Sequence, residues 1–154
     1  MSFQLRALPS DPFAPLFALS DDALAERGAV RRVADRPRSL PCRVSLRDAE
    51  PGETVLLLNY EHQPARSPFR STYAIYVRRN ATQARLAPGE VPEILRSRLL
   101  SVRAFDAAGM LLDADVVDGR EVEALIARLL GKPEAEYLHV HFARPGCFAA
   151  RVDR

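Results

Sequence analysis

Two histidines in the last fifth of the chain have a spacing that brings two imidazoles together. His139 and His141 alternate with Leu138, Val140 and Phe142. Because successive side chains of a β-strand project to opposite faces, a strand here places both histidines on one face, about 7 Å apart at roughly 3.4 Å per residue. The three apolar side chains then point into the core. Since imidazole titrates near neutral pH and is the commonest metal ligand, this face is a candidate binding surface.

A metal site at this face would need a third ligand and outer hydrogen-bond partners. His62 and Cys147 are the candidates for this third ligand, in addition to His139 and His141. If Pro145 and Gly146 form a two-residue turn, cross-strand pairing places Cys147 on the face opposite the histidines, whereas a bulge reverses this. We keep metal binding as an alternative, expect no cofactor, and take histidines that face solvent or a polar pocket as the simplest interpretation.

A second polar group follows the apolar run Val55–Leu58. The segment 59–63 (Asn-Tyr-Glu-His-Gln) is rich in hydrogen-bonding side chains, and Arg70 precedes the next predicted strand. Loops at strand ends often carry binding sites, and the planar fork of arginine suits a carboxylate or phosphate. We therefore predict a polar pocket for a small anionic metabolite, with an internal hydrogen-bond network that holds the loop as the competing interpretation. The candidate ligand-binding residues are Tyr60, His62, Arg70, His139, His141 and Cys147.

The cysteines give weaker signals. Cys147 could act as a nucleophile if Arg144 and Arg151 lowered the pKa of its thiol, but no thiol-enzyme signature surrounds it, and packing is the simpler interpretation. Cys42 lies far from Cys147, without the paired spacing of a zinc site or a disulfide framework. Both are expected to be free thiols, which indicates the reducing bacterial cytosol.

Several functional classes are disfavoured. The sequence has no glycine-rich phosphate loop, nucleophile elbow, dinucleotide fingerprint or helical zinc-protease motif, so whether it is an enzyme stays undecided. A net charge of +2 and the lack of a recognisable binding motif argue against nucleic acid. No stretch approaches the roughly 20 apolar residues that span a bilayer, and the start lacks a signal segment, so we expect a soluble, cytoplasmic protein.

The charges are nevertheless distributed unevenly. Residues 66–103 contain eight arginines against two acids, whereas residues 106–136 contain eight acids against three bases. Surfaces of opposite sign can steer an anionic ligand or join two subunits. A homodimer or a non-catalytic interaction module is therefore the alternative function.

The pattern of elements predicts one α+β domain over residues 1–154. Strands are rich in β-branched and aromatic residues, and Val122, Leu125, Ile126, Leu129 and Leu130 form an apolar stripe at helical period. Helices are expected at 20–27, 93–97 and, from a capping box at Asp118 and Glu121, up to Gly131. Strands are expected at 3–8, 42–46, 54–60, 72–78, 99–105, 110–117, 137–143 and 148–152. The result is a mainly antiparallel β-sheet with one amphipathic helix near the C-terminal third and short N-terminal helices.

Three segments together resemble a bacterial family known only as domain of unknown function 1203. They are residues 55–63, residues 100–106, and the His139–His141 motif with Pro145–Cys147. The resemblance extends from around Pro41 to the C-terminus. It implies membership of that family and no activity, substrate or catalytic residue.

Overall fold

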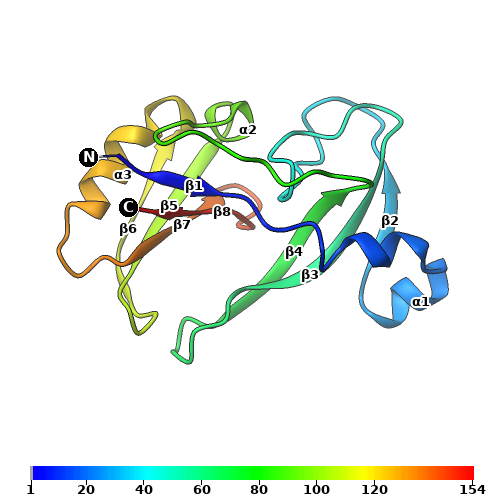
Figure 1. Ribbon diagram of the computed structural model, residues 1–154, viewed down its shortest axis with the longest axis horizontal. Coiled ribbons are helices and arrows are strands. Elements are labelled where there is room, and N and C mark those ends of the chain that lie inside the picture. The colour runs from blue at the N-terminus through cyan, green and yellow to red at the C-terminus, as the bar shows by residue number, and fades with distance from the viewer. Residues whose placement is uncertain (1) are drawn as a thin grey trace. The chain divides into compact units, whose positions relative to one another are not determined.

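The computed structural model describes residues 2–154, which form two compact units (Figure 1). The first unit contains the chain up to residue 6 together with residues 61–73 and 85–154, and the second contains residues 7–60 and 74–84. Neither unit is a continuous stretch of sequence. Because the chain passes back and forth between the units, no single linker in the sequence separates them. The sequence therefore predicted one domain.

The first unit is organised around a five-stranded sheet in the order β1-β8-β7-β5-β6, and every neighbouring pair is antiparallel. β5 and β6 form the predicted hairpin, and β7 occupies the centre of the sheet. The elements of this unit are β1 (Gln4–Arg6), α2 (Glu93–Arg96), β5 (Leu99–Phe105), β6 (Leu111–Asp118), η2 (Gly119–Glu121), α3 (Val122–Leu130), β7 (Tyr137–Phe142) and β8 (Phe148–Asp153).

One face of this sheet is apolar and is covered by α3, which lies beside the strands in Figure 1. Leu138 and Val140 on β7 are fully buried and lie opposite Ala104 and Val102 on β5. The apolar stripe predicted for the helix is buried along its whole length. Arg128 on the helix also pairs with β6 aspartates. These contacts leave the opposite face of the sheet for Tyr137, His139 and His141.

The start of α3 differs from the predicted capping box. The Asp118 carboxylate accepts a hydrogen bond from the Arg120 N–H at 3.0 Å and begins the 3₁₀ turn η2, and the α-helix starts only at Val122. The same turn makes a close backbone approach at Gly119, whose N–H donates to the Arg98 carbonyl at 2.9 Å. A Cβ at this position would lie 1.8 Å from the Leu95 carbonyl oxygen. Glycine therefore ties η2 to the end of α2.

The second unit has a three-stranded sheet in the order β2-β3-β4, with β3 in the centre as predicted. Ser20 caps the predicted helix, because its hydroxyl accepts the Ala23 N–H at 3.1 Å. The last three residues of β3 and the first three of β4 belong to the first unit. The elements are η1 (Ala14–Ala18), α1 (Asp21–Glu26), β2 (Val30–Val33), β3 (Thr54–Gln63) and β4 (Ser71–Arg78).

The strand predicted over Cys42–Leu46 does not form. This segment turns, with Leu46 at a positive φ of 49°, and Cys42 forms only an isolated bridge with Tyr76. The Cys42 sulfur accepts the backbone N–H groups of Ser45 at 3.4 Å and Arg78 at 3.3 Å, which stabilises the turned conformation. The edge strand is instead β2, which pairs antiparallel with β3. Its four residues include two arginines, so apolar alternation could not reveal it.

The observed class is α+β with mainly antiparallel sheets, as predicted from the sequence. Among the described residues, no helix is both long enough and apolar enough to cross a bilayer.

Candidate functional site

The centre of the site is the buried pair His139 and His141 on β7. Their relative exposures are 3% and 2%, so of the two possibilities in the simplest interpretation, solvent or a polar pocket, neither histidine faces solvent. They share a face, and Leu138 and Val140 point to the other, as strand alternation predicts.

His62 joins the two histidines from the end of β3. Its ring centroid lies 6.1 Å from that of His139 and 5.1 Å from that of His141, and the latter two are 6.4 Å apart. Residues 61–73, hereafter the hairpin tip, hold it there. Within the tip, the buried Gln63 amide donates to the Tyr137 hydroxyl at 3.0 Å, and the Ser67 hydroxyl donates to the Gly109 carbonyl at 2.8 Å. Three of the predicted site residues therefore converge in the first unit.

Aromatic rings that the sequence reasoning missed enclose these imidazoles. The Phe148 ring stacks on His62 at 5.4 Å and lies 5.1 Å from His139 and 5.9 Å from His141. Phe105 and Tyr137 contact His139 at 5.1 and 5.2 Å. Phe148 lies opposite His141 in the strand register. Cross-strand pairing would have identified Phe148 as a neighbour of His141 if the bulge at this point had been known.

Two arginines flank His139 on the neighbouring strands. Arg103 on β5 and Arg151 on β8 both lie opposite it in the register, and cross-strand partners share a face. Burial lowers the pKa of His139 to about 3, reinforced by repulsion from His141, His62, Arg151 and Arg103. His139 is therefore neutral at neutral pH, in an environment that disfavours further positive charge.

The two guanidinium groups have different partners. Arg151 donates through Nε to Asp153 at 2.7 Å, and its guanidinium lies 4.1 Å above the Tyr137 ring. Arg103 donates to the Ser101 hydroxyl at 3.3 Å, and no carboxylate within residues 2–154 pairs with it. Burial lowers the pKa of Arg103. The site thus contains a half-buried cation without a counterion.

The hydrogen bonds of the two β7 histidines differ as well. His141 Nδ1 lies 3.0 Å from the Gly146 carbonyl oxygen, which makes Nδ1 the donor. His139 Nδ1 is buried and has no hydrogen-bond partner within the described chain. Such a group costs about 1–3 kcal/mol of desolvation. It is a free hydrogen-bonding position inside the aromatic enclosure.

The remaining predicted residues lie elsewhere. Arg70 forms an ion pair with Glu61 at 3.0 Å, and 59% of its side chain is exposed. Tyr60 belongs to the second unit, where its ring packs 5.8 Å from Phe13 and burial raises its pKa. Cys147 is buried and lies opposite Phe142, whose N–H donates to the Cys147 carbonyl at 2.9 Å. The register that sets His141 opposite Phe148 thus places Cys147 on the other face of the sheet from the histidines.

No three histidine, cysteine or carboxylate side chains of residues 2–154 are arranged to hold a metal ion. The three imidazole rings nevertheless lie close together, with centroids 5.1 to 6.4 Å apart. Metal binding stays a prediction that elemental analysis can test.

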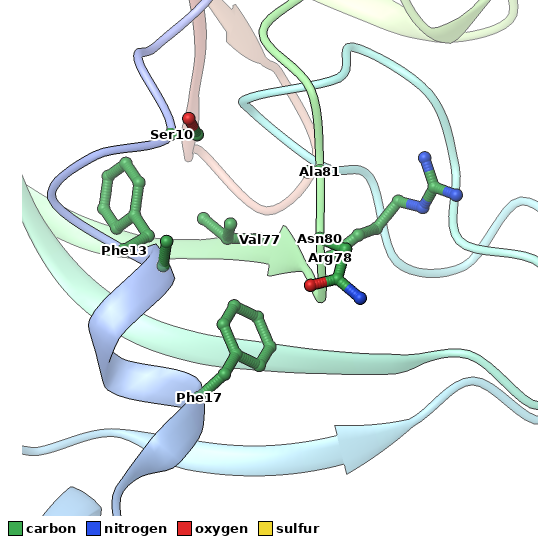
Figure 2. Close-up of a pocket in the computed structure, with 8 residues that line it drawn as sticks. Ser10, Phe13, Phe17, Val77, Arg78, Asn80 and Ala81 are labelled. Atoms are coloured by element: carbon green, nitrogen blue, oxygen red, sulfur yellow. The ribbon is translucent and has the colours of Figure 1, made fainter.

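The second unit has a separate hollow of about 270 Å³ that the sequence did not indicate. Figure 2 shows the rings of Phe13 and Phe17 beside it, with Val77 behind them and Asn80 at its edge. The guanidinium of Arg78 points away from the two rings and binds Glu53 at 2.7 Å. This hollow is mainly a gap in the packing of η1 against β4, and it contains no titratable group available for chemistry.

The fold and the site together define an α+β protein with a buried histidine cluster between arginines. The chain belongs to the family described as "Protein of unknown function (DUF1203)", whose pattern matches residues 39–154. That range contains His62, Arg103, His139, His141 and Arg151. Neither a curated protein nor a solved structure matches the chain.

Proposed function

We propose that this protein binds a small anionic metabolite at the histidine cluster of the first unit. His139 supplies a neutral hydrogen-bonding group, and Arg103 and Arg151 supply positive charge. The observation that carries the proposal is the buried, unpartnered Nδ1 of His139 between two arginines on the adjacent strands.

The neutral state of His139 supports this assignment. A ring whose pKa is about 3 carries one N–H and one bare nitrogen at neutral pH. With Nδ1 protonated, it donates a hydrogen bond to an oxygen of the ligand without placing a third full positive charge in the enclosure. The aromatic rings around it exclude water, which strengthens such a bond.

The charge balance points to an anion rather than a neutral ligand. Arg103 lacks a carboxylate partner and is half-buried, so the long hydrogen bond to the Ser101 hydroxyl compensates only in part for the hydration that its guanidinium loses. A carboxylate or phosphate oxygen offers the charge-assisted bonds that guanidinium prefers. The same anion would also attract the side chains whose repulsion now lowers the pKa of His139, which are His141, His62, Arg151 and Arg103.

The experiment is isothermal titration calorimetry with oxalate and acetate as probes. We expect saturable binding that Arg103→Gln weakens about tenfold, because one charge-assisted hydrogen bond contributes roughly 1.5–3 kcal/mol. Arg66→Gln is the matched control, since Arg66 is an exposed arginine of the same unit. Absence of binding to both probes, or equal loss in the two variants, would refute the proposal.

We further propose that the protein works in the reducing cytosol. Cys42 and Cys147 are both free and buried, so neither forms the disulfide that an oxidising compartment favours. Fractionation of cells that express the tagged protein would place it with cytosolic markers, and recovery in a membrane or exported fraction would contradict the proposal.

Self-association is the second candidate function, and one observation favours it. The edge strand β6 and the turn before it expose the apolar side chains of Met110, Leu111, Leu112 and Val116. Against it, the backbone N–H groups of Ala114 and Val116 already donate to the carboxylates of Asp113 and Asp115, both at 2.8 Å. Because bonded N–H groups and charged side chains blunt a sheet edge, ligand binding is the better supported function.

A further inference from the structure

A basic hollow lies within the first unit, lined by residues other than those of the histidine cluster. It has a volume of about 520 Å³, inside the usual range of ligand sites. α2, η2, the first residue of β5 and the turn after β7 meet around it. Its lining residues are Glu93, Arg96, Ser97, Arg98, Leu99, Asp118, Arg120 and Arg144.

Three of the four arginines in this hollow are fixed in place by the protein. Arg120 donates to the Asp118 carboxylate through Nε at 2.9 Å and Nη2 at 2.6 Å. Arg96 forms an ion pair with Glu123. Arg98 donates to the Ile94 carbonyl at 3.1 Å, and its guanidinium lies 5.1 Å from the centroid of the Phe142 ring. Fixed guanidiniums lose little conformational entropy when a ligand binds.

Arg144 is the exception. It is exposed on the turn after β7, and within residues 2–154 it forms no ion pair or side-chain hydrogen bond. Its whole set of N–H donors is available to a ligand in the hollow. A free arginine at the edge of three fixed ones can close over a bound anion.

The geometry of the hollow depends on the close approach at Gly119. Its N–H bond to the Arg98 carbonyl joins the segment of Arg96 and Arg98 to that of Asp118 and Arg120. Because a Cβ would strike the Leu95 carbonyl oxygen at 1.8 Å, only glycine allows these guanidiniums to share one hollow.

The charge balance indicates what kind of anion fits. Four arginines and two carboxylates line the hollow, and Glu123 pairs with Arg96, so one positive charge remains in excess. Arg120 uses two of its five N–H donors on Asp118 and keeps the others. An anion with several acceptor oxygens matches these donors better than a carboxylate, which has only two oxygens.

We propose that this hollow binds the phosphate group of a small phosphomonoester, with Arg120 and Arg144 as the principal donors. The phosphate lies among the guanidiniums and the esterified part extends toward the open side. The site is separate from the proposed anion site at the histidines, since none of its lining residues belongs to that cluster.

Isothermal titration calorimetry at pH 8, where phosphate is a dianion, tests the proposal with inorganic phosphate and phenyl phosphate. Both probes should bind, and Arg144→Gln should weaken each about tenfold. Because Arg144 has no intramolecular partner, this variant should unfold at the same temperature as the wild type. Arg66→Gln, which removes another exposed arginine of the same unit, should leave both affinities unchanged.

Each other outcome overturns part or all of the proposal. If neither probe binds, or if Arg144→Gln and Arg66→Gln have equal effects, the hollow is not an anion site. If inorganic phosphate binds and phenyl phosphate does not, the monoester assignment is wrong. Arg103→Gln separates the two sites of the unit, because it should leave phosphate affinity intact. Loss of phosphate binding in Arg103→Gln would show that phosphate binds at the histidine cluster and not in this hollow.

Discussion

His139 on β7 lies directly opposite Arg103 on β5, on the face of the sheet that α3 leaves uncovered. The pair places a buried imidazole beside a guanidinium that no carboxylate neutralises. Packing alone would be satisfied by apolar residues at both positions, at lower desolvation cost. A third, negatively charged group that bound beside the two side chains would offset this desolvation cost.

The first prediction concerns the pH dependence of stability. His139 has a pKa of about 3 when folded, against 6.5 as the ordinary value, so the unfolded chain binds its proton first as the pH falls. This group therefore stabilises the fold fully above pH 6.5, and that contribution is lost as the pH falls toward 3. Between pH 6.5 and 5 the loss is about 1.5 kcal/mol. Urea unfolding of the wild type and of His139→Leu would measure it, and parallel curves for the two proteins would contradict it.

The second prediction compares one substitution at two positions of the same strand and face. His139→Leu removes a buried nitrogen that has no partner, so the free energy of unfolding at pH 7 should stay within about 1 kcal/mol or rise. His141→Leu leaves the Gly146 carbonyl without its imidazole partner and should cost about 1–3 kcal/mol. Equal losses in the two variants would show that His139 has a protein partner.

A third prediction tests how the hairpin tip is held over the cluster. Tyr137→Phe leaves the Gln63 amide buried at 2% exposure without its hydroxyl partner, which should cost about 1–3 kcal/mol. Gln63→Met in the same chain removes the stranded amide and should restore part of that stability. A double-mutant cycle by thermal unfolding measures the coupling between the two side chains, and a coupling near zero would argue against this anchor.

Alternation was the most reliable signal in the sequence. It placed His139 and His141 on one face, because a side-chain period of two survives wherever a strand forms. Apolar runs and a content rich in β-branched and aromatic residues located β3 to β8 to within a few residues. Register was not accessible in this way: the bulge between Val140 and His141 sets Phe148, rather than Ala150, opposite His141.

Other features were missed because they depend on contacts between distant segments. The arginines opposite His139 come from strands whose pairing the sequence does not state. The turn at Cys42–Leu46 alternates like a strand, yet its thiol bonds two backbone N–H groups and bends it. Nearness in sequence groups Tyr60 and Arg70 with His62. Tyr60 instead belongs to the second unit, and Arg70 pairs with Glu61.

The fourth prediction is that the protein is a monomer in solution at about 0.1 mM. β6 is the longer edge of the five-stranded sheet, and its Asp113 and Asp115 carboxylates bond neighbouring N–H groups and the α3 cation Arg128. These bonds oppose pairing with a second copy. Sedimentation velocity would give the mass directly. A dimer that Val116→Lys dissociates would favour the interaction-module alternative instead.

The central claim is that an anion belongs beside His139, and the pKa of this residue tests it most directly. The pKa can be followed by histidine nitrogen NMR during pH titrations with and without saturating oxalate. Because a bound anion favours the protonated ring, the pKa should rise by one unit or more from about 3. An identical titration curve in the presence of the ligand would contradict the account.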